Sequence, residues 1–296
     1  MRVTNSMMVR STLRDLSQSL SRLQETQTKL STGKEITRPS VNPGATATAM
    51  SMRQDLRRAE QRLRSLNDAD GWLSTADSAL TSSLQSMNRA KEIAVRAANS
   101  GGITDPVARQ ALAAEIRSIR SEMLATANTS YGSRSVFNGT AAGAAYDTNG
   151  VYLGNGASII RDVAPSTSIA VNLTGPQVFG TAGGPVGDVF EVLDRMATAI
   201  IAGDQAALVT EHTNLDAARN VIGAATVEIG TRGARLLEVK ARAESDKLLL
   251  TTQLSQVEDT DIVDTLIRVK SQEASYQATL QVAAKILPMS LLDYLR

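Results

Sequence analysis

The stretch LSTGKEITRPSVNPGA, residues 30–45, separates two segments with helical periodicity and therefore decides how the chain is organised. Its Thr-Gly-Lys resembles the end of a phosphate-binding loop. The first glycine of that motif, the strand before it and the Ser or Thr after the lysine are all missing. Gly33 instead suits a helix C-cap, and the two prolines force extended conformations on the residues before them. We predict a turn between two helices, defined by Gly33, Pro39, Pro43 and Gly44.

The segment before this turn carries one narrow apolar stripe. Its residues recur at alternating spacings of three and four, which is the a/d pattern of a coiled coil, with one glutamine in the series. A single narrow stripe cannot fold alone and needs a partner helix. The stripe consists of Leu13, Leu16, Leu20, Leu23 and Leu30.

The last segment of the chain repeats the pattern, with one glutamate in the series, and Pro288 is expected to end its helix. Ordinary packing in a helical bundle explains a lone stripe. Two matched stripes at opposite ends of the sequence instead favour pairing with each other or with other subunits. The second stripe consists of Ile262, Leu266, Val269, Tyr276, Leu280, Ala283 and Leu287.

Between these ends, helical periodicity is long and is interrupted once by a different composition. Met52 to Ala98 and about Gln205 to Val257 read as long helices, whereas residues 131–185 are rich in Gly, Asn, Ser and Thr and contain short β-type runs. We predict a mainly α fold, a long coiled-coil-like helical bundle built from both chain ends, with a small β-rich insert domain in the middle. The predicted domains are an N-terminal helix and turn (1–44), a helical rod (45–130), a β-rich domain (131–187), a helical return (188–257) and a C-terminal helix that pairs with the N-terminus (258–296).

The composition argues against several classes of function. There is no cysteine and a single histidine, His212, so thiol chemistry is excluded and histidine-based metal sites are not expected. Lys and Arg number 31 against 30 Asp and Glu, and no run of about 18 apolar residues occurs. We expect no catalytic residues, no cofactor, no metal, no nucleic acid and no membrane insertion. The N-terminus lacks the apolar core of a signal peptide. This predicts a cytosolic location, unless the protein is exported by a route that does not cleave the N-terminus.

Five arginines form a basic cluster in the predicted helical rod. Its arginines are interleaved with Asp55 and Glu60 at helical spacing, and no aromatic residue lies nearby for base stacking. A solvated or subunit-contacting face is therefore favoured over a nucleic-acid patch. The cluster consists of Arg53, Arg57, Arg58, Arg62 and Arg64.

Several dispersed blocks resemble the bacterial flagellin superfamily, in the right order and over nearly the full length. Where that family's turn motif has two acidic residues before its second proline, this sequence has Val41 and Asn42. The block GPQVFG (175–180) and a compact β region favour the member that joins the flagellar hook to the filament. Flagellin, the filament subunit, is the alternative. The similar blocks are LSTGKEITRPSVNPGA, NDADGWLSTADSAL (67–80), NRAKEIAVRAANS (88–100), EDTDIVDTL (258–266), QEASYQATLQ (272–281) and SLLDYLR (290–296).

The resemblance implies a structural protein and not an enzyme. It implies secretion through the flagellar type III apparatus to an extracellular hook–filament junction. The terminal helices would order on assembly and line an inner tube. The implied partners are further copies in a ring or short helical layer, a preceding hook-associated protein, flagellin, and an export chaperone at the C-terminal helix. A cytosolic coiled-coil adaptor is the rival class, and it predicts no secretion.

Overall fold

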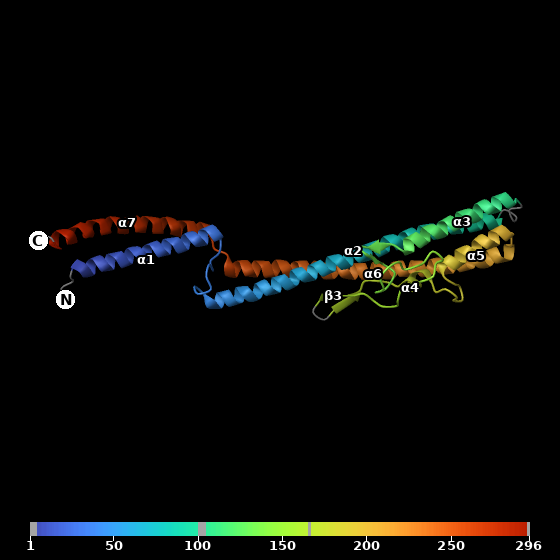
Figure 1. Cartoon of the computed structure of the whole chain (residues 1–296), viewed down its shortest axis with the longest axis horizontal. Coiled ribbons are helices and arrows are strands. Elements are labelled where there is room, and N and C mark those ends of the chain that lie inside the picture. The colour runs from blue at the N-terminus through green and yellow to red at the C-terminus, as the bar shows by residue number, and fades with distance from the viewer. Residues whose placement is uncertain (1–4, 100–104, 165–166, 295–296) are drawn as a thin grey trace. The chain divides into compact units, whose positions relative to one another are not determined.

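The structure is a computed structural model that describes residues 5–99, 105–164 and 167–294. This part of the chain is mainly helical, with two short hairpins between the long helices, which confirms the predicted fold class (Figure 1). None of the helices in these ranges has a stretch long and apolar enough to cross a membrane. In chain order the elements are α1 (Asn5–Thr32), α2 (Pro43–Asn99), α3 (Pro106–Ala127), β1 (Ser130–Tyr131), β2 (Arg134–Ser135), β3 (Ile160–Ala164), β4 (Thr167–Ala170), α4 (Gly175–Phe179), α5 (Val189–Ala202), α6 (Gln205–Glu258) and α7 (Ile262–Tyr294).

The chain divides into two compact units. The terminal unit consists of Met1–Ala59 and Asp246–Arg296, and the central unit consists of Glu60–Ser245. Helices α2 and α6 each contribute residues to both units. The candidate assembly site belongs to the terminal unit, and the main hydrophobic core belongs to the central unit.

Within the central unit, α2 and α6 bury apolar residues in one core. Leu66, Leu73, Leu80 and Met87 of α2 are buried at seven-residue intervals, which is the heptad spacing of a coiled coil. Each fully buried leucine or methionine contributes about 1.5–3 kcal/mol relative to an exposed one. The long helices are therefore held by tertiary burial rather than by helix propensity alone.

Two charged side chains of α2 form ion pairs with side chains of opposite charge on α6. Asp70 accepts from Lys240 at 3.1 Å, and Lys91 donates to Asp216 at 2.6 Å. The two pairs have opposite polarity along α2, so a parallel arrangement or a shift of register would separate both of them. They therefore specify the antiparallel register of the two helices more than they stabilise it, since such part-exposed pairs contribute little.

Helices α3 and α5 pack against each other in the same unit (Figure 1). Asp105 caps α3 by accepting from the Val107 amide, and Pro106 occupies its first turn, where a proline costs no helical hydrogen bond. At the other end Asn128 is the C-cap, and its side chain bonds both backbone groups of Tyr146. The Asn128 amide donates to the Tyr146 carbonyl at 3.0 Å and accepts from the Tyr146 N–H at 2.9 Å.

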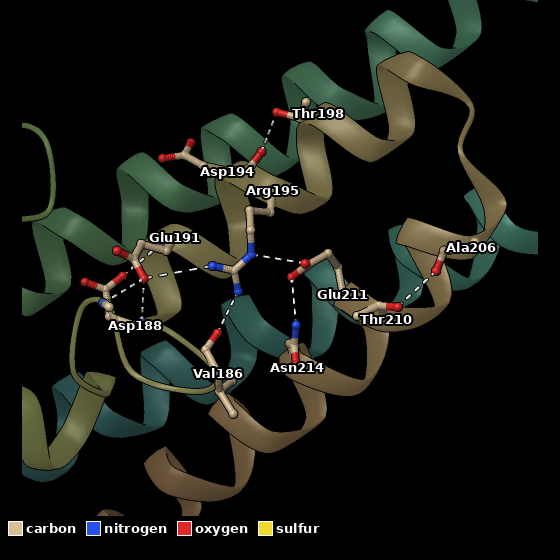
Figure 2. Close-up of polar contacts among 11 residues, drawn as sticks. Val186, Asp188, Glu191, Asp194, Arg195, Thr198, Ala206, Thr210, Glu211 and Asn214 are labelled. Atoms are coloured by element: carbon tan, nitrogen blue, oxygen red, sulfur yellow. Dashed lines mark hydrogen bonds and ion pairs between the residues drawn. The ribbon is translucent and has the colours of Figure 1, made fainter.

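The loop before α5 is held by Arg195 (Figure 2). Its Nε donates to Glu211 of α6 at 3.0 Å and its Nη2 donates to the Val186 carbonyl at 2.6 Å. Asp188 and Glu191 form a capping box at the start of α5, in which the Asp188 carboxylate accepts from the Glu191 amide at 2.8 Å. Burial raises the pKa of Asp188 above its ordinary value. These contacts tie the loop, α5 and α6 together.

The β-rich segment has an aromatic centre rather than an extended sheet. β1 pairs with β2, and β3 pairs with β4, both antiparallel. The ring of Tyr146 lies 5.1 Å from that of Phe190, 5.3 Å from that of Tyr152 and 5.8 Å from that of Phe179, between ring centroids. This cluster brings aromatic residues from the segment and from α4 and α5 into the core of the central unit.

Candidate assembly site

The N-terminal helix ends where the sequence predicts. α1 finishes at Thr32, and Gly33 has a φ of 68°, a left-handed conformation that glycine adopts without strain. The Gly33 amide donates to the Lys29 carbonyl at 2.8 Å, which closes the last helical turn. The Thr-Gly-Lys sequence is therefore a helix terminus and not a phosphate-binding loop.

The residues after α1 pair with the residues that join α6 to α7. Lys34 and Asp259 form an isolated antiparallel bridge, and the Thr260 amide donates to the Gly33 carbonyl at 3.0 Å. The ammonium group of Lys34 also donates to the carboxylate of Asp259 at 2.6 Å. We call this pairing of residues 33–35 with residues 258–260 the corner contact.

Glu258 is the buried centre of the corner contact. Its carbonyl accepts from the Glu35 amide at 2.8 Å, and its side chain is only 5% exposed. The carboxylate forms ion pairs with Lys34, at 3.4 Å, and with Arg53 of α2. A buried carboxylate is tolerated when cations and hydrogen bonds compensate its lost hydration, and here Lys34 and Arg53 supply them.

Two further carboxylates of this region have lowered pKa values. A hydrogen bond from Lys34, followed by one from the Ser255 hydroxyl, lowers the pKa of Asp259. A hydrogen bond from Lys29, at 2.7 Å, lowers the pKa of Glu35. Both groups therefore keep their charge to a lower pH than free carboxyl groups do.

The turn residues between α1 and α2 have separate local roles. The Asn42 side chain accepts from the Ala45 amide at 3.0 Å, and Pro43 is the first residue of α2. Asn42 thus caps α2 where the family motif has an acid, whereas the Val41 side chain is 48% exposed. A Cβ added at Gly44 would make only an ordinary contact, 3.8 Å from Asn42 Oδ1, so the local packing does not require glycine there. Pro39 lies in the irregular stretch before α2.

Helices α1 and α7 lie side by side in the terminal unit (Figure 1). Residues of the predicted stripes that recur at seven-residue intervals are buried or half-buried on both helices. On α1 these are Leu16, Leu23 and Leu30, and on α7 they are Val269, Tyr276 and Ala283.

The remaining described members of both stripes are more exposed. Their exposed fractions are 49% for Leu13, 37% for Leu20, 61% for Ile262, 46% for Leu266 and 40% for Leu280. Each helix therefore has a second apolar line that its neighbour in the same chain does not cover.

Small polar residues occupy the positions that these leucines were expected to fill. Thr26 of α1 and Thr265 of α7 are buried in the paired faces. Their hydroxyls are satisfied locally, by the Arg22 carbonyl for Thr26 and by the Thr260 hydroxyl for Thr265. A search for apolar residues alone passes over them. In the sequence, Thr26 lies seven residues after Ser19, and Thr265 lies seven residues before Gln272. The structure shows that Ser19 and Gln272 are half-buried as well.

The expectation that Pro288 ends the last helix is wrong, because α7 continues to Tyr294. A proline removes one backbone hydrogen bond and crowds the preceding turn, which can bend a helix without ending it. The side chain of Leu287 lies outside the described part of the structure.

No group of three or more His, Asp or Glu side chains within the described ranges is arranged to hold a metal ion.

The basic cluster of α2 is partly ion-paired. Arg53 contacts Glu258 and Arg58 contacts Asp55. The geometry of this region is that of paired helices with uncovered apolar lines, which defines a candidate protein-assembly site.

Comparison with known proteins shows which class of protein the chain resembles. Residues 3–142 match the family model for the bacterial flagellin N-terminal helical region. The resemblance to the flagellin superfamily is thereby confirmed.

The chain is similar over its whole length to a particular member of that superfamily. It is 26% identical to flagellar hook-associated protein 3 of Escherichia coli (strain K12), over 98% of each chain. It is 24% identical to flagellin of Bacillus subtilis (strain 168), over 100% of each chain. The solved structure of a putative flagellar hook-associated protein from Vibrio parahaemolyticus has the same fold, with a TM-score of 0.68 and 20% identity over 74% of this chain and 100% of that one. These relatives support a structural role in the bacterial flagellum and not an enzymatic one.

Proposed function

We propose that this protein joins the flagellar hook, through another hook-associated protein, to the flagellin filament. On this proposal it is secreted, remains outside the cell, and polymerises with further copies into a ring or short helical layer. The full-length similarity to flagellar hook-associated protein 3 supports this choice within the superfamily. The GPQVFG block, which forms the short helix α4, is a second feature in its favour.

The uncovered apolar lines of α1 and α7 are the single observation that carries the proposal. Leu13 and Leu20 on α1, and Leu266 and Leu280 on α7, are all at least 37% exposed. Covering such side chains is favourable by about 25 cal/mol for each Å² of apolar surface. Two helices alone leave these lines in water, whereas neighbouring subunits would cover them and offset the entropy of ordering the chain ends.

The same lines explain the partners that we propose. Further copies, the preceding hook-associated protein and flagellin would each cover part of them after assembly. Before export, a chaperone would cover α7 by holding its apolar face in a groove. The absence of cysteine suits passage through a narrow channel as an unfolded chain, because no disulfide can form early.

A truncation tests the role of the last helix. Removal of residues 262–296 should leave the central unit folded, since its core lies in residues 66–243, and should abolish incorporation into flagella. A matched control replaces two exposed polar residues of α7, Arg268 and Lys270, with alanine and leaves its apolar residues intact. Normal incorporation of the truncated chain would overturn the proposal.

Flagellin is the second candidate, because Bacillus subtilis flagellin also aligns over the full length. Deletion of the gene separates the two. Loss of a junction protein should give cells that carry hooks, lack filaments and release flagellin into the medium. Loss of flagellin itself should give hooks without filaments and no released flagellin.

A further inference from the structure

We propose that an open groove between α2 and α6 in the central unit receives a basic helix of a second copy of this chain. The inference rests on the proposed function, because it concerns the contact between neighbouring subunits of an assembled layer. The groove has a volume of about 360 Å³. The lining residues on which the inference depends are Leu73 and Asp77 of α2, and Gly230, Gly233, Ala234 and Leu237 of α6.

Two glycines in the groove have no steric role inside their own chain. A Cβ added at Gly230 or Gly233 would meet no atom within 4 Å. By contrast, a Cβ at Gly71 would lie 2.5 Å from the Tyr131 hydroxyl, so packing requires that glycine. Glycine inside a helix lowers the folded-to-unfolded ratio about fivefold relative to alanine. The free space above Gly230 and Gly233 therefore suits the close approach of another chain.

The side chains that line the groove favour a basic side chain as its occupant. The Asp77 carboxylate is exposed, and within the described residues it has no ion pair and accepts no hydrogen bond. Asp70, the other acid in the groove, is already paired with Lys240. Leu237 is 56% exposed beside them. An arginine fits this combination, since its aliphatic stem can lie on the leucine while its guanidinium pairs with Asp77.

The basic cluster of α2 offers such arginines. Among the described residues, neither Arg57 nor Arg62 has an ion pair, whereas Arg53 and Arg58 are engaged. The cluster and the groove share no residue, so a contact between them is heterologous. Heterologous contacts repeat from copy to copy into a closed ring or a helical layer, which is the assembly proposed above.

A matched pair of substitutions tests whether the groove must be open. Gly233→Leu fills it. Gly223→Leu is the control, because Gly223 also lies in α6 with no atom within 4 Å of an added Cβ, yet does not line the groove. Neither change should lower the melting temperature of the isolated protein. We expect Gly233→Leu to reduce incorporation into flagella at least tenfold and Gly223→Leu to leave it unchanged. Wild-type incorporation of Gly233→Leu would overturn the inference.

Disulfide cross-linking tests the identity of the occupant, because the natural chain has no cysteine. Asp77→Cys and Arg62→Cys are placed in one chain. These positions are fifteen residues apart on α2, about 22 Å at 1.5 Å per residue, so they cannot be bridged within one subunit. Oxidised flagella should give a ladder of dimers, trimers and longer chains, whereas either single variant should give dimers at most.

The outcomes separate the two proposals. A double variant that enters flagella but forms no species longer than a dimer would overturn the inference alone. Cross-linking of position 77 only to a different protein would do the same. Absence of the unmodified protein from flagella would overturn the proposed function, and the inference with it.

Discussion

Lys34 and Asp259 are 225 residues apart in sequence, yet they share a side-chain hydrogen bond of 2.6 Å and an antiparallel backbone bridge. Through this pair, the end of α1 is fixed to the start of α7. The neighbouring Glu258 adds a buried carboxylate held by Lys34 and Arg53. Four predictions follow from this corner contact and from the core of the central unit.

The first prediction concerns the two cations on Glu258. Lys34→Met or Arg53→Met alone should cost about 1 kcal/mol, because the other cation remains. The double variant should cost about 3 to 5 kcal/mol, because it leaves a buried carboxylate without a cation. Hydrogen exchange of the Thr260 amide, which is bonded within the corner contact, measures the effect. Arg242→Met removes an exposed pair with Glu238 and should change little. Purely additive losses in the double variant would contradict the prediction.

The second prediction is a loosening of the corner contact in acid. The pKa values of Asp259 and Glu35 are lower in the folded chain than the ordinary value near 4. Their stabilising contribution is therefore complete above that ordinary value and is lost as the pH falls through the lowered pKa values. Exchange protection of the Thr260 amide, corrected for intrinsic rates, should fall below about pH 4. Asp259→Asn should weaken that dependence, and an unchanged pH profile in this variant would contradict the assignment.

The third prediction concerns Asn128, whose side chain bonds both the N–H and the carbonyl of Tyr146. Asn128→Ala should lower the free energy of unfolding of the central unit by about 2 kcal/mol, since two part-buried hydrogen bonds to Tyr146 are lost. Asn67→Ala, at an exposed position of α2, should stay within about 0.5 kcal/mol of wild type. Urea unfolding of the full chain measures both variants. Equal unfolding midpoints for wild type and Asn128→Ala would contradict the prediction.

The fourth prediction compares two tyrosines of the aromatic cluster. Burial raises the pKa of Tyr146 well above its ordinary value, and its hydroxyl has no hydrogen-bond partner among the described residues. Tyr146→Phe should therefore leave stability unchanged or raise it by about 1 kcal/mol. Tyr152→Phe should cost about 1 kcal/mol, because the Tyr152 hydroxyl contacts the carbonyls of Phe137 and Asn155. The reverse order of melting temperatures would show that the Tyr146 hydroxyl is satisfied.

The helices were predictable because their signals are local. Helical periodicity predicted the long segments of α2 and α6, and Gly33 predicted the end of α1. Each of these signals depends on residues within a few positions along the chain.

The corner contact was not predictable, because it depends on residues from opposite ends of the chain. Nothing near Lys34 indicates that Asp259 will be its partner. The paired faces of α1 and α7 were predicted only in part, since the sequence stripes contain both Leu16, which faces α7, and Leu13, which does not. Which of two adjacent heptad lines is covered depends on how each helix is rotated about its axis, and local periodicity does not determine that rotation.

The pairing of α1 with α7 also sets an order of events. A contact between residues so far apart in sequence closes one of the longest loops that the chain can form, which has a high loop-closure entropy and slows folding. Helix α1 cannot make this pairing until α7 is present. A chain that is still incomplete at its C-terminus therefore carries α1 without its intramolecular neighbour, and its corner contact cannot form.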